Sequence, residues 1–207
     1  MTRFQRLLAA ISSTIVLLAA LGAPGVAREQ SRDQLPLRLS ATAVNSAGVG
    51  DGRDLRTEIT ITRWTTPTER SALLTRLAEG GSRGLMLALL PVPSHGRLRM
   101  PEWKGPDPHK MLLGWDLRYA SQETHPDGSR RIVLGTDRYI SIWESRETPR
   151  TTDYPFTLLE LRIDSKGEGV GKASAAARLA VGKDKQAIEL ENYTSQPVML
   201  KQIRIEP

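Results

Sequence analysis

Six carboxylates in or beside predicted strands are the residues of this chain best suited to acid–base chemistry. They are Asp116, Asp137, Asp153, Glu160, Glu189 and Glu191. A glycosidase needs two such groups about 5 to 10 Å apart across a sugar cleft. Asp116, Asp137 and Glu160 are the candidate catalytic residues for this chemistry.

A structural role for the same acids is the favoured interpretation. Three of them, Asp116, Glu160 and Glu189, alternate with leucine, which is typical of the outward face of a half-buried strand. On such a face, acids pair with basic residues across the sheet, and Arg118, Arg138 and Arg162 are placed to do this.

Glu160 lies in the largely apolar stretch PFTLLELRI, residues 155–163. In a strand, Leu159, Leu161 and Ile163 share the face that meets the core, and Glu160 lies on the other face with Phe156 and Leu158. Two apolar neighbours do not fit a fully solvated surface, so either a helical insert or a ligand covers this face. A covered Glu160 needs a partner or a raised pKa.

Metal and nucleophile chemistry have weak support in the sequence. His95, His109 and His125 lie in loops rich in Pro and Gly, without metal-ligand spacing, and the chain has 0 cysteines. There is no G-x-S-x-G nucleophile elbow and no phosphate-binding glycine loop. We therefore expect no metal and no cofactor, while a triad assembled by the fold stays open.

Four aromatic residues on predicted strands are the candidate ligand-binding residues: Trp115, Tyr119, Tyr139 and Trp143. Trp115, Leu117 and Tyr119 occupy alternate positions of segment 111–124, which predicts that they face one way. Aromatic strands around a barrel mouth would suit a small ligand.

The strand pattern predicts a mainly β fold over residues 37–207. Alternating or β-branched segments occur at 37–44, 55–64, 96–100, 111–124, 130–145, 155–164, 167–181, 186–193 and 196–205. The last two read as a terminal hairpin, and 167–181 reads as one strand. About ten antiparallel strands at this spacing indicate a sandwich or a barrel, and the pattern leaves both open.

A helical hairpin is predicted near residues 66–91. Thr66, Pro67 and Glu69 form a capping-box sequence, and Gly80 and Gly81 end the first helix. The run 82–91 is short enough to be a helix or a strand, and a helix is favoured.

The first 27 residues have the organisation of a secretory signal peptide, with Arg3 and Arg6 before an apolar run and Ala27 at the cleavage point. An uncleaved anchor is the alternative; after cleavage no transmembrane span is expected. Residues 28–36 are polar and expected to be flexible. Export without cysteine suits a bacterial periplasmic or secreted protein.

The net charge of +6 is spread along the chain rather than gathered in a basic stripe. Its densest basic point, DGSRR at 127–131, is interpreted as a solvated loop, and nucleic acid is not expected as a partner.

Five segments, RWTTPTER (63–70), GWDLRYA (114–120), TDRYISIWESR (136–146), TTDYPFTLLELRI (151–163) and ELENYTSQPVML (189–200), carry a resemblance. Together they resemble an uncharacterised group of predicted secreted bacterial proteins with no assigned function. The resemblance implies export, and it implies no activity, site or cofactor.

The sequence therefore favours an exported, non-catalytic protein that binds a small or amphipathic ligand or assists envelope assembly through an envelope protein. One alternative is an envelope hydrolase that acts on a glycan with paired carboxylates. Another is a protein-interaction module.

Overall fold

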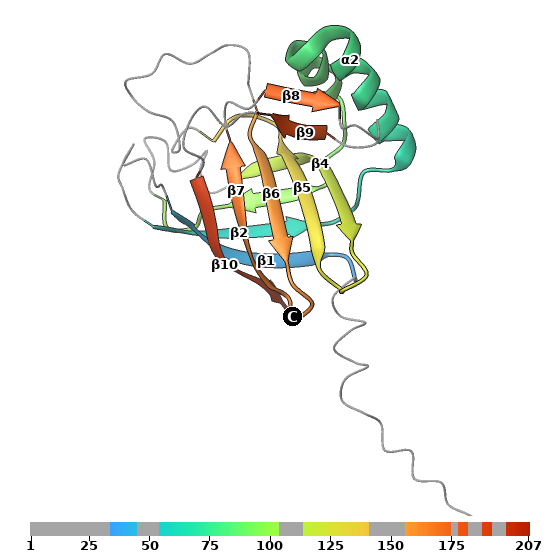
Figure 1. Ribbon diagram of the computed structural model, residues 1–207. Helices are drawn as coiled ribbons and strands as arrows, with labels where there is room; N and C mark the ends of the chain where they lie inside the picture. Colours follow the sequence, from blue (N-terminus) through green and yellow to red (C-terminus); the bar gives the residue numbers. More distant parts are fainter. Residues whose placement is uncertain are drawn as a thin grey trace, which may run out of the picture.

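The computed structural model describes residues 34–44, 54–103, 114–140, 156–174, 178–181, 188–191 and 198–207. Within these ranges, eight antiparallel strands close into a barrel (Figure 1). They are β1 (Leu37–Val44), β2 (Leu55–Ile61), β3 (Gly96–Arg99), β4 (Trp115–Thr124), β5 (Arg130–Thr136), β6 (Leu158–Ile163), β7 (Glu168–Ser174) and β10 (Val198–Glu206). The mainly β antiparallel fold is confirmed, and its form is a barrel.

Each barrel strand pairs with the next one along the chain until β7, which pairs with β10, and β10 closes the barrel on β1. A closed barrel leaves none of these strands with an open edge. Alternate side chains point inward, and the fully buried ones include Leu39, Ile59, Ile61, Leu98, Leu117, Ile132, Leu134, Leu159, Leu161 and Ile163. The predicted core face of β6 is therefore confirmed.

The predicted helical insert is α2 (Pro67–Leu89), which lies outside the barrel (Figure 1). Thr66 caps this helix, and Thr66 and Glu69 form the predicted capping box. Gly81 has non-helical dihedral angles (φ 58°, ψ −154°), so α2 consists of two helical segments that meet at this residue. Glycine adopts such a φ readily. The helix favoured for 82–91 is confirmed as far as Leu89.

The apolar face of α2 covers the outer face of β4, β5 and β6. Its buried residues Leu73, Leu74, Leu77, Leu85 and Leu89 form one cluster with Tyr119, Val133, Phe156 and Leu158. The cover that the sequence requires for Phe156 and Leu158 is thus the helical insert.

Tyr119 lies in this outer cluster, so the prediction that it faces the same way as Trp115 and Leu117 is wrong. The register of β4 against β5 shifts between Leu117 and Tyr119, which leaves Arg118 as an extra residue. Such a bulge turns the following side chains to the other face. Tyr119 then lies over Gly135, where an added Cβ would come within 3.2 Å of the tyrosine Cβ.

The strands after residue 167 also differ from the prediction. Segment 167–181 is not one strand, since β7 ends at Ser174 and β8 (Arg178–Val181) pairs with β9 (Ile188–Glu191) in a separate two-stranded sheet. The predicted terminal hairpin is absent from the described residues because β10 lies between β1 and β7. Both backbone edges of β10 are paired with barrel strands, and β9 pairs with β8 instead.

Among the described residues, no helix combines the length and the apolarity that crossing a bilayer requires. The predicted signal peptide and residues 28–33 lie outside the described part of the chain.

Candidate functional site

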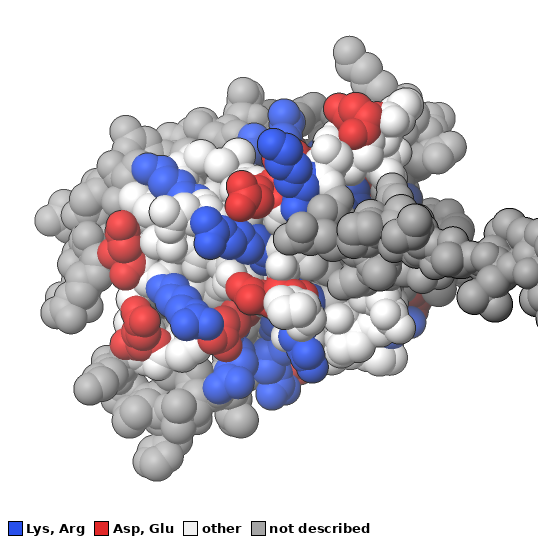
Figure 2. All heavy atoms as spheres, turned by 90° about the horizontal axis from the view of Figure 1, so that it is seen from below, with Lys and Arg blue, Asp and Glu red and all other residues white. Residues whose placement is uncertain are grey.

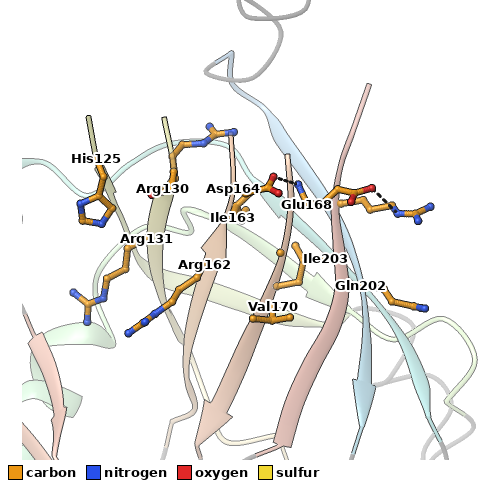
Figure 3. Close-up of a pocket in the computed structure, with 13 residues that line it drawn as sticks. His125, Arg130, Arg131, Arg162, Ile163, Asp164, Glu168, Val170, Gln202 and Ile203 are labelled. Carbon is orange, nitrogen blue, oxygen red and sulfur yellow. Dashed lines mark hydrogen bonds and ion pairs between the residues drawn. The ribbon is translucent and has the colours of Figure 1, made fainter. Parts of the chain in front are cut away.

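A groove of about 760 Å³ lies on the outer face of β5, β6, β7 and β10 (Figure 3). Its size is within the range of about 300 to 1,000 Å³ that is typical of small-molecule sites. The side chains that give it its chemical character are those of His125, Arg131, Arg162, Val170, Gln202 and Arg204.

Strand register brings three of these side chains into a row. Arg131 of β5 is directly paired with Arg162 of β6, and Arg162 is directly paired with Val170 of β7. Arg131 and Arg162 extend in the same direction from their strands (Figure 3). The two arginines form one side of the groove, which we call the basic wall, and Val170 forms its apolar floor.

Glu160 binds both arginines of the basic wall. Its carboxylate is only 5% exposed. Oε1 accepts hydrogen bonds from Nε of Arg131 at 3.3 Å and from Nε of Arg162 at 3.1 Å. Oε2 lies 4.0 Å from Nζ of Lys172. The carboxylate therefore fixes both guanidinium groups side by side, although the Arg162 side chain stays 72% exposed.

The pKa of Glu160 follows from these contacts. Burial alone raises the pKa of a carboxyl group, but the hydrogen bonds and charges of Arg131, Arg162 and Lys172 outweigh burial and hold the pKa below its usual 4.5. A general acid in glycoside hydrolysis needs a raised pKa. The lowered pKa of Glu160 therefore does not suit a general acid, and the partners that a covered Glu160 needs are present.

The far side of the groove is a bulge in β10. The register against β7 shifts between Leu200 and Ile203, opposite Val170, which is 54% exposed. Gln202 lies in the bulge at a φ of 52°, in the left-handed region that non-glycine residues avoid. Its side chain is directed away from Arg162 toward β1 (Figure 3), where Oε1 accepts a hydrogen bond of 3.5 Å from Thr42.

The acids at the rim of the groove are engaged elsewhere. Oδ1 of Asp164 accepts from the backbone N–H groups of Lys166 and Glu168 and so holds the turn between β6 and β7. Glu168 forms an ion pair of 3.7 Å with Arg204. From below the barrel, positive and negative side chains are interspersed (Figure 2).

The other two candidate catalytic carboxylates, Asp116 and Asp137, lie close to each other. Neither is at a strand position paired with Glu160. The backbone N–H of Asp116 donates to Oδ1 of Asp137 at 3.1 Å. Asp116 pairs with Arg97 at 3.1 Å and with Arg118 at 3.6 Å, and Asp137 pairs with Arg138 at 2.7 Å. The predicted pairing across the sheet is seen between Asp116 and Arg97, whereas Arg118 and Arg138 contact acids of their own segments.

The four aromatic candidates do not line one pocket. Trp115 is 3% exposed and its Nε1–H donates to the carbonyl of Tyr139 at 3.2 Å. The Trp103 ring stacks on Trp115 at 6.2 Å, and the Arg138 guanidinium lies 5.7 Å from the Trp115 ring. Tyr119 lies under α2, and Trp143 is outside the described residues.

The groove itself is a site that the sequence did not reveal. Arg130 and Arg131 belong to the basic point interpreted as a solvated loop, yet both open strand β5, and Arg130 is buried. The site could have been predicted only if Arg131 had been paired with Arg162, and this pairing requires knowledge of the strand register.

A second polar cluster lies where α2 begins. His95 is fully buried, and its Nδ1–H donates to the carbonyl of Pro93 at 3.0 Å. Its Nε2 is 3.9 Å from Oε2 of Glu69 and has no hydrogen-bond partner within the described structure. Arg63 binds Oε1 of Glu69 at 2.6 Å.

These contacts lower the pKa values of both Glu69 and His95. The hydrogen bond from Arg63, with those from Thr66, lowers the pKa of Glu69 to about 2. Burial, with the positive charges of Arg63 and Arg118, lowers the pKa of His95 below its usual 6.5. In the part of the chain that the structure describes, no three histidine, aspartate or glutamate side chains are grouped to hold a metal ion. His109 lies outside that part.

Comparison of the chain with protein-family models, with curated proteins and with solved structures yields no match. The groove is therefore interpreted from its own geometry.

Proposed function

We propose that this chain is an exported, non-catalytic binding protein whose external groove takes a small amphipathic anion. One observation carries the proposal: the basic wall of Arg131 and Arg162 stands directly beside an exposed apolar residue, Val170. An anionic group would bind the guanidinium groups, and an apolar segment would cover Val170.

Two physical effects support such a ligand. Hydrogen bonds between guanidinium and an anion are charge-assisted, and they are about twice as strong as neutral ones. Covering apolar surface contributes about 25 cal/mol per Å². Export rests on the signal-peptide pattern of residues 1–27.

Titration calorimetry with decyl amphiphiles, kept below their micelle concentrations, tests the proposal. Decanoate and decyl sulfate should bind with one molecule per chain, whereas decyl glucoside and decyltrimethylammonium should bind far more weakly. Binding of all four with equal affinity would contradict the proposal, because the basic wall would then have no role.

A matched pair of variants locates the site. Arg162→Gln should weaken decyl sulfate binding by about tenfold, the equivalent of one charge-assisted hydrogen bond. Arg56→Gln is the control, since Arg56 is 60% exposed, pairs with Glu58 at 3.4 Å and lies outside the groove. Equal losses in both variants would indicate non-specific attraction to a positive protein.

A second function, binding of an envelope protein, is favoured by the surface of α2. Leu87 and Leu90 are 55% and 59% exposed, and the segment 82–92 that contains them has no acid. Cross-linking in the envelope fraction should then give a defined adduct that Leu87→Ser with Leu90→Ser abolishes and Val170→Ser retains.

A further inference from the structure

We infer that the anionic group of the ligand is a phosphate monoester, bound between Arg131 and Arg162. This inference rests on the proposed function, because it assigns the head group of the ligand in the same groove.

The charge balance of the basic wall favours a doubly charged group. Arg131 and Arg162 both contact Glu160, so two cations share one buried acid. Glu123 adds a second acid only at the margin, 3.9 Å from Arg131 with its side chain 62% exposed. The wall keeps a positive excess, and the attraction to a ligand rises in proportion to the ligand's charge.

The geometry of the wall favours three acceptor oxygens over two. Side chains at directly paired strand positions start with Cβ atoms about 5 Å apart, and the shared Oε1 of Glu160 keeps Arg131 and Arg162 adjacent at their outer ends. Each guanidinium is a planar fork that binds two oxygens. A phosphate monoester presents three terminal oxygens, which two adjacent forks can share, whereas a carboxylate presents two.

The row of paired positions also orients the ligand. With phosphate at Arg162, the next position across the sheet is Val170 and the next is the β10 bulge. The apolar segment of the ligand therefore leaves the phosphate over Val170 toward β10.

Calorimetry with decyl phosphate and decyl sulfate separates charge from shape, because both head groups are tetrahedral and the chains are identical. At about pH 8 decyl phosphate carries two charges and should bind about tenfold more tightly than decyl sulfate. At about pH 5, below the second phosphate pKa of about 6, the advantage should largely disappear. Decyl sulfate measured at both pH values corrects for changes in the protein itself, because its head group keeps the same charge.

The possible outcomes differ for the two proposals. Equal affinity for decyl phosphate and decyl sulfate at about pH 8 would overturn the phosphate inference and leave the amphipathic-anion function intact. Binding of neither would overturn the function itself.

Inorganic phosphate should compete at least about tenfold more weakly than decyl phosphate, since it cannot cover Val170. If inorganic phosphate binds as tightly, the ligand is free phosphate and the amphiphile is excluded.

Arg162→Lys tests whether the planar guanidinium group is required, because it keeps the positive charge and removes the planar group. This variant should lose about fivefold in decyl phosphate affinity, because an ammonium group cannot bind two oxygens in one plane. Arg56→Lys is the matched control, since Arg56 is 60% exposed, pairs with Glu58 and lies outside the groove. An unchanged affinity in Arg162→Lys, at an unchanged melting temperature, would overturn the assignment of phosphate to this fork.

Discussion

Arg131 and Arg162 occupy directly paired positions of β5 and β6, and the same oxygen of Glu160 accepts a hydrogen bond from each. Like charges at paired positions destabilise a sheet, so the two arginines depend on the buried carboxylate between them. The residue that the sequence offers as a catalytic acid is, in the fold, what permits two cations to stand together.

Glu160→Gln should therefore lower the free energy of unfolding by about 2 kcal/mol, because it leaves two facing guanidinium groups without their shared anion. Glu123→Gln should cost less than about 0.5 kcal/mol, since an exposed ion pair contributes little. Urea denaturation at neutral pH measures both. Adding Arg162→Gln to Glu160→Gln should restore part of the loss, and a purely additive double variant would contradict this account.

The pH dependence of the same pair gives an independent check. The pKa of Glu160 is lowered in the folded state, so its charge stabilises the fold above the unfolded value near 4.5, and this contribution is lost as the pH falls through the folded pKa. The stability difference between wild type and Glu160→Gln should shrink below about pH 4.5. A difference that is constant with pH would show that shape, not charge, explains the loss.

His95 should make the protein less stable on mild acidification. Its folded pKa lies below 6.5, so below that pH the unfolded chain binds a proton that the folded chain does not. Stability should then fall with decreasing pH by up to about 1.4 kcal/mol per pH unit, and it is fully present above the unfolded pKa.

Thermal melts of wild type and His95→Gln between about pH 7.5 and 5 measure this slope, above the range in which carboxyl groups titrate. The slope should flatten in His95→Gln, and His125→Gln, at an exposed position, serves as the control. A slope that survives His95→Gln would assign the effect to another group.

Gln202→Gly should stabilise the fold by about 1 kcal/mol, because glycine has no Cβ to oppose a φ of 52°. Gln202→Ala loses the same contact with Thr42 but keeps the Cβ, so it serves as the matched control. The difference in the free energy of unfolding between the two variants, measured by chemical denaturation, gives the cost of the positive φ for a residue with a Cβ. If alanine is as stable as glycine, the bulge is not strained.

Leu85 and Leu87 lie two positions apart on α2 with opposite environments, since Leu85 is 0% and Leu87 is 55% exposed. Leu85→Ala should cost about 2 to 4 kcal/mol by leaving a cavity against the barrel. Leu87→Ala should change stability by less than about 0.5 kcal/mol. Similar costs in the two variants would mean that α2 does not pack on the barrel as described.

Local patterns predict much of this fold from the sequence. Residues 37–44 alternate and form β1, and Thr66, Pro67 and Glu69 begin α2 as expected. The two faces of β6 were also predictable, including the need to cover Phe156 and Leu158. In each case the structure depends on side chains that are neighbours in sequence.

Features that depend on distant pairing could not be predicted. The bulge at Arg118 becomes visible only against Thr136 and Gly135, and it places Tyr119 under α2. The same limit applies to the groove: Arg131 and Arg162 are 31 positions apart by their numbers, and only the β5–β6 register makes them a pair.

The closure of the barrel also has a kinetic consequence. Ser40 of β1 donates a hydrogen bond to Glu206 of β10 across 166 positions of sequence, so the seam between these strands cannot form until β10 has been synthesised. Contacts of such separation slow folding, because a long loop must be ordered first. A nascent chain that lacks β10 cannot close the barrel, because β10 pairs with both β1 and β7. If the protein is exported as proposed here, slow closure of the barrel leaves time for the unfolded chain to be translocated before it folds.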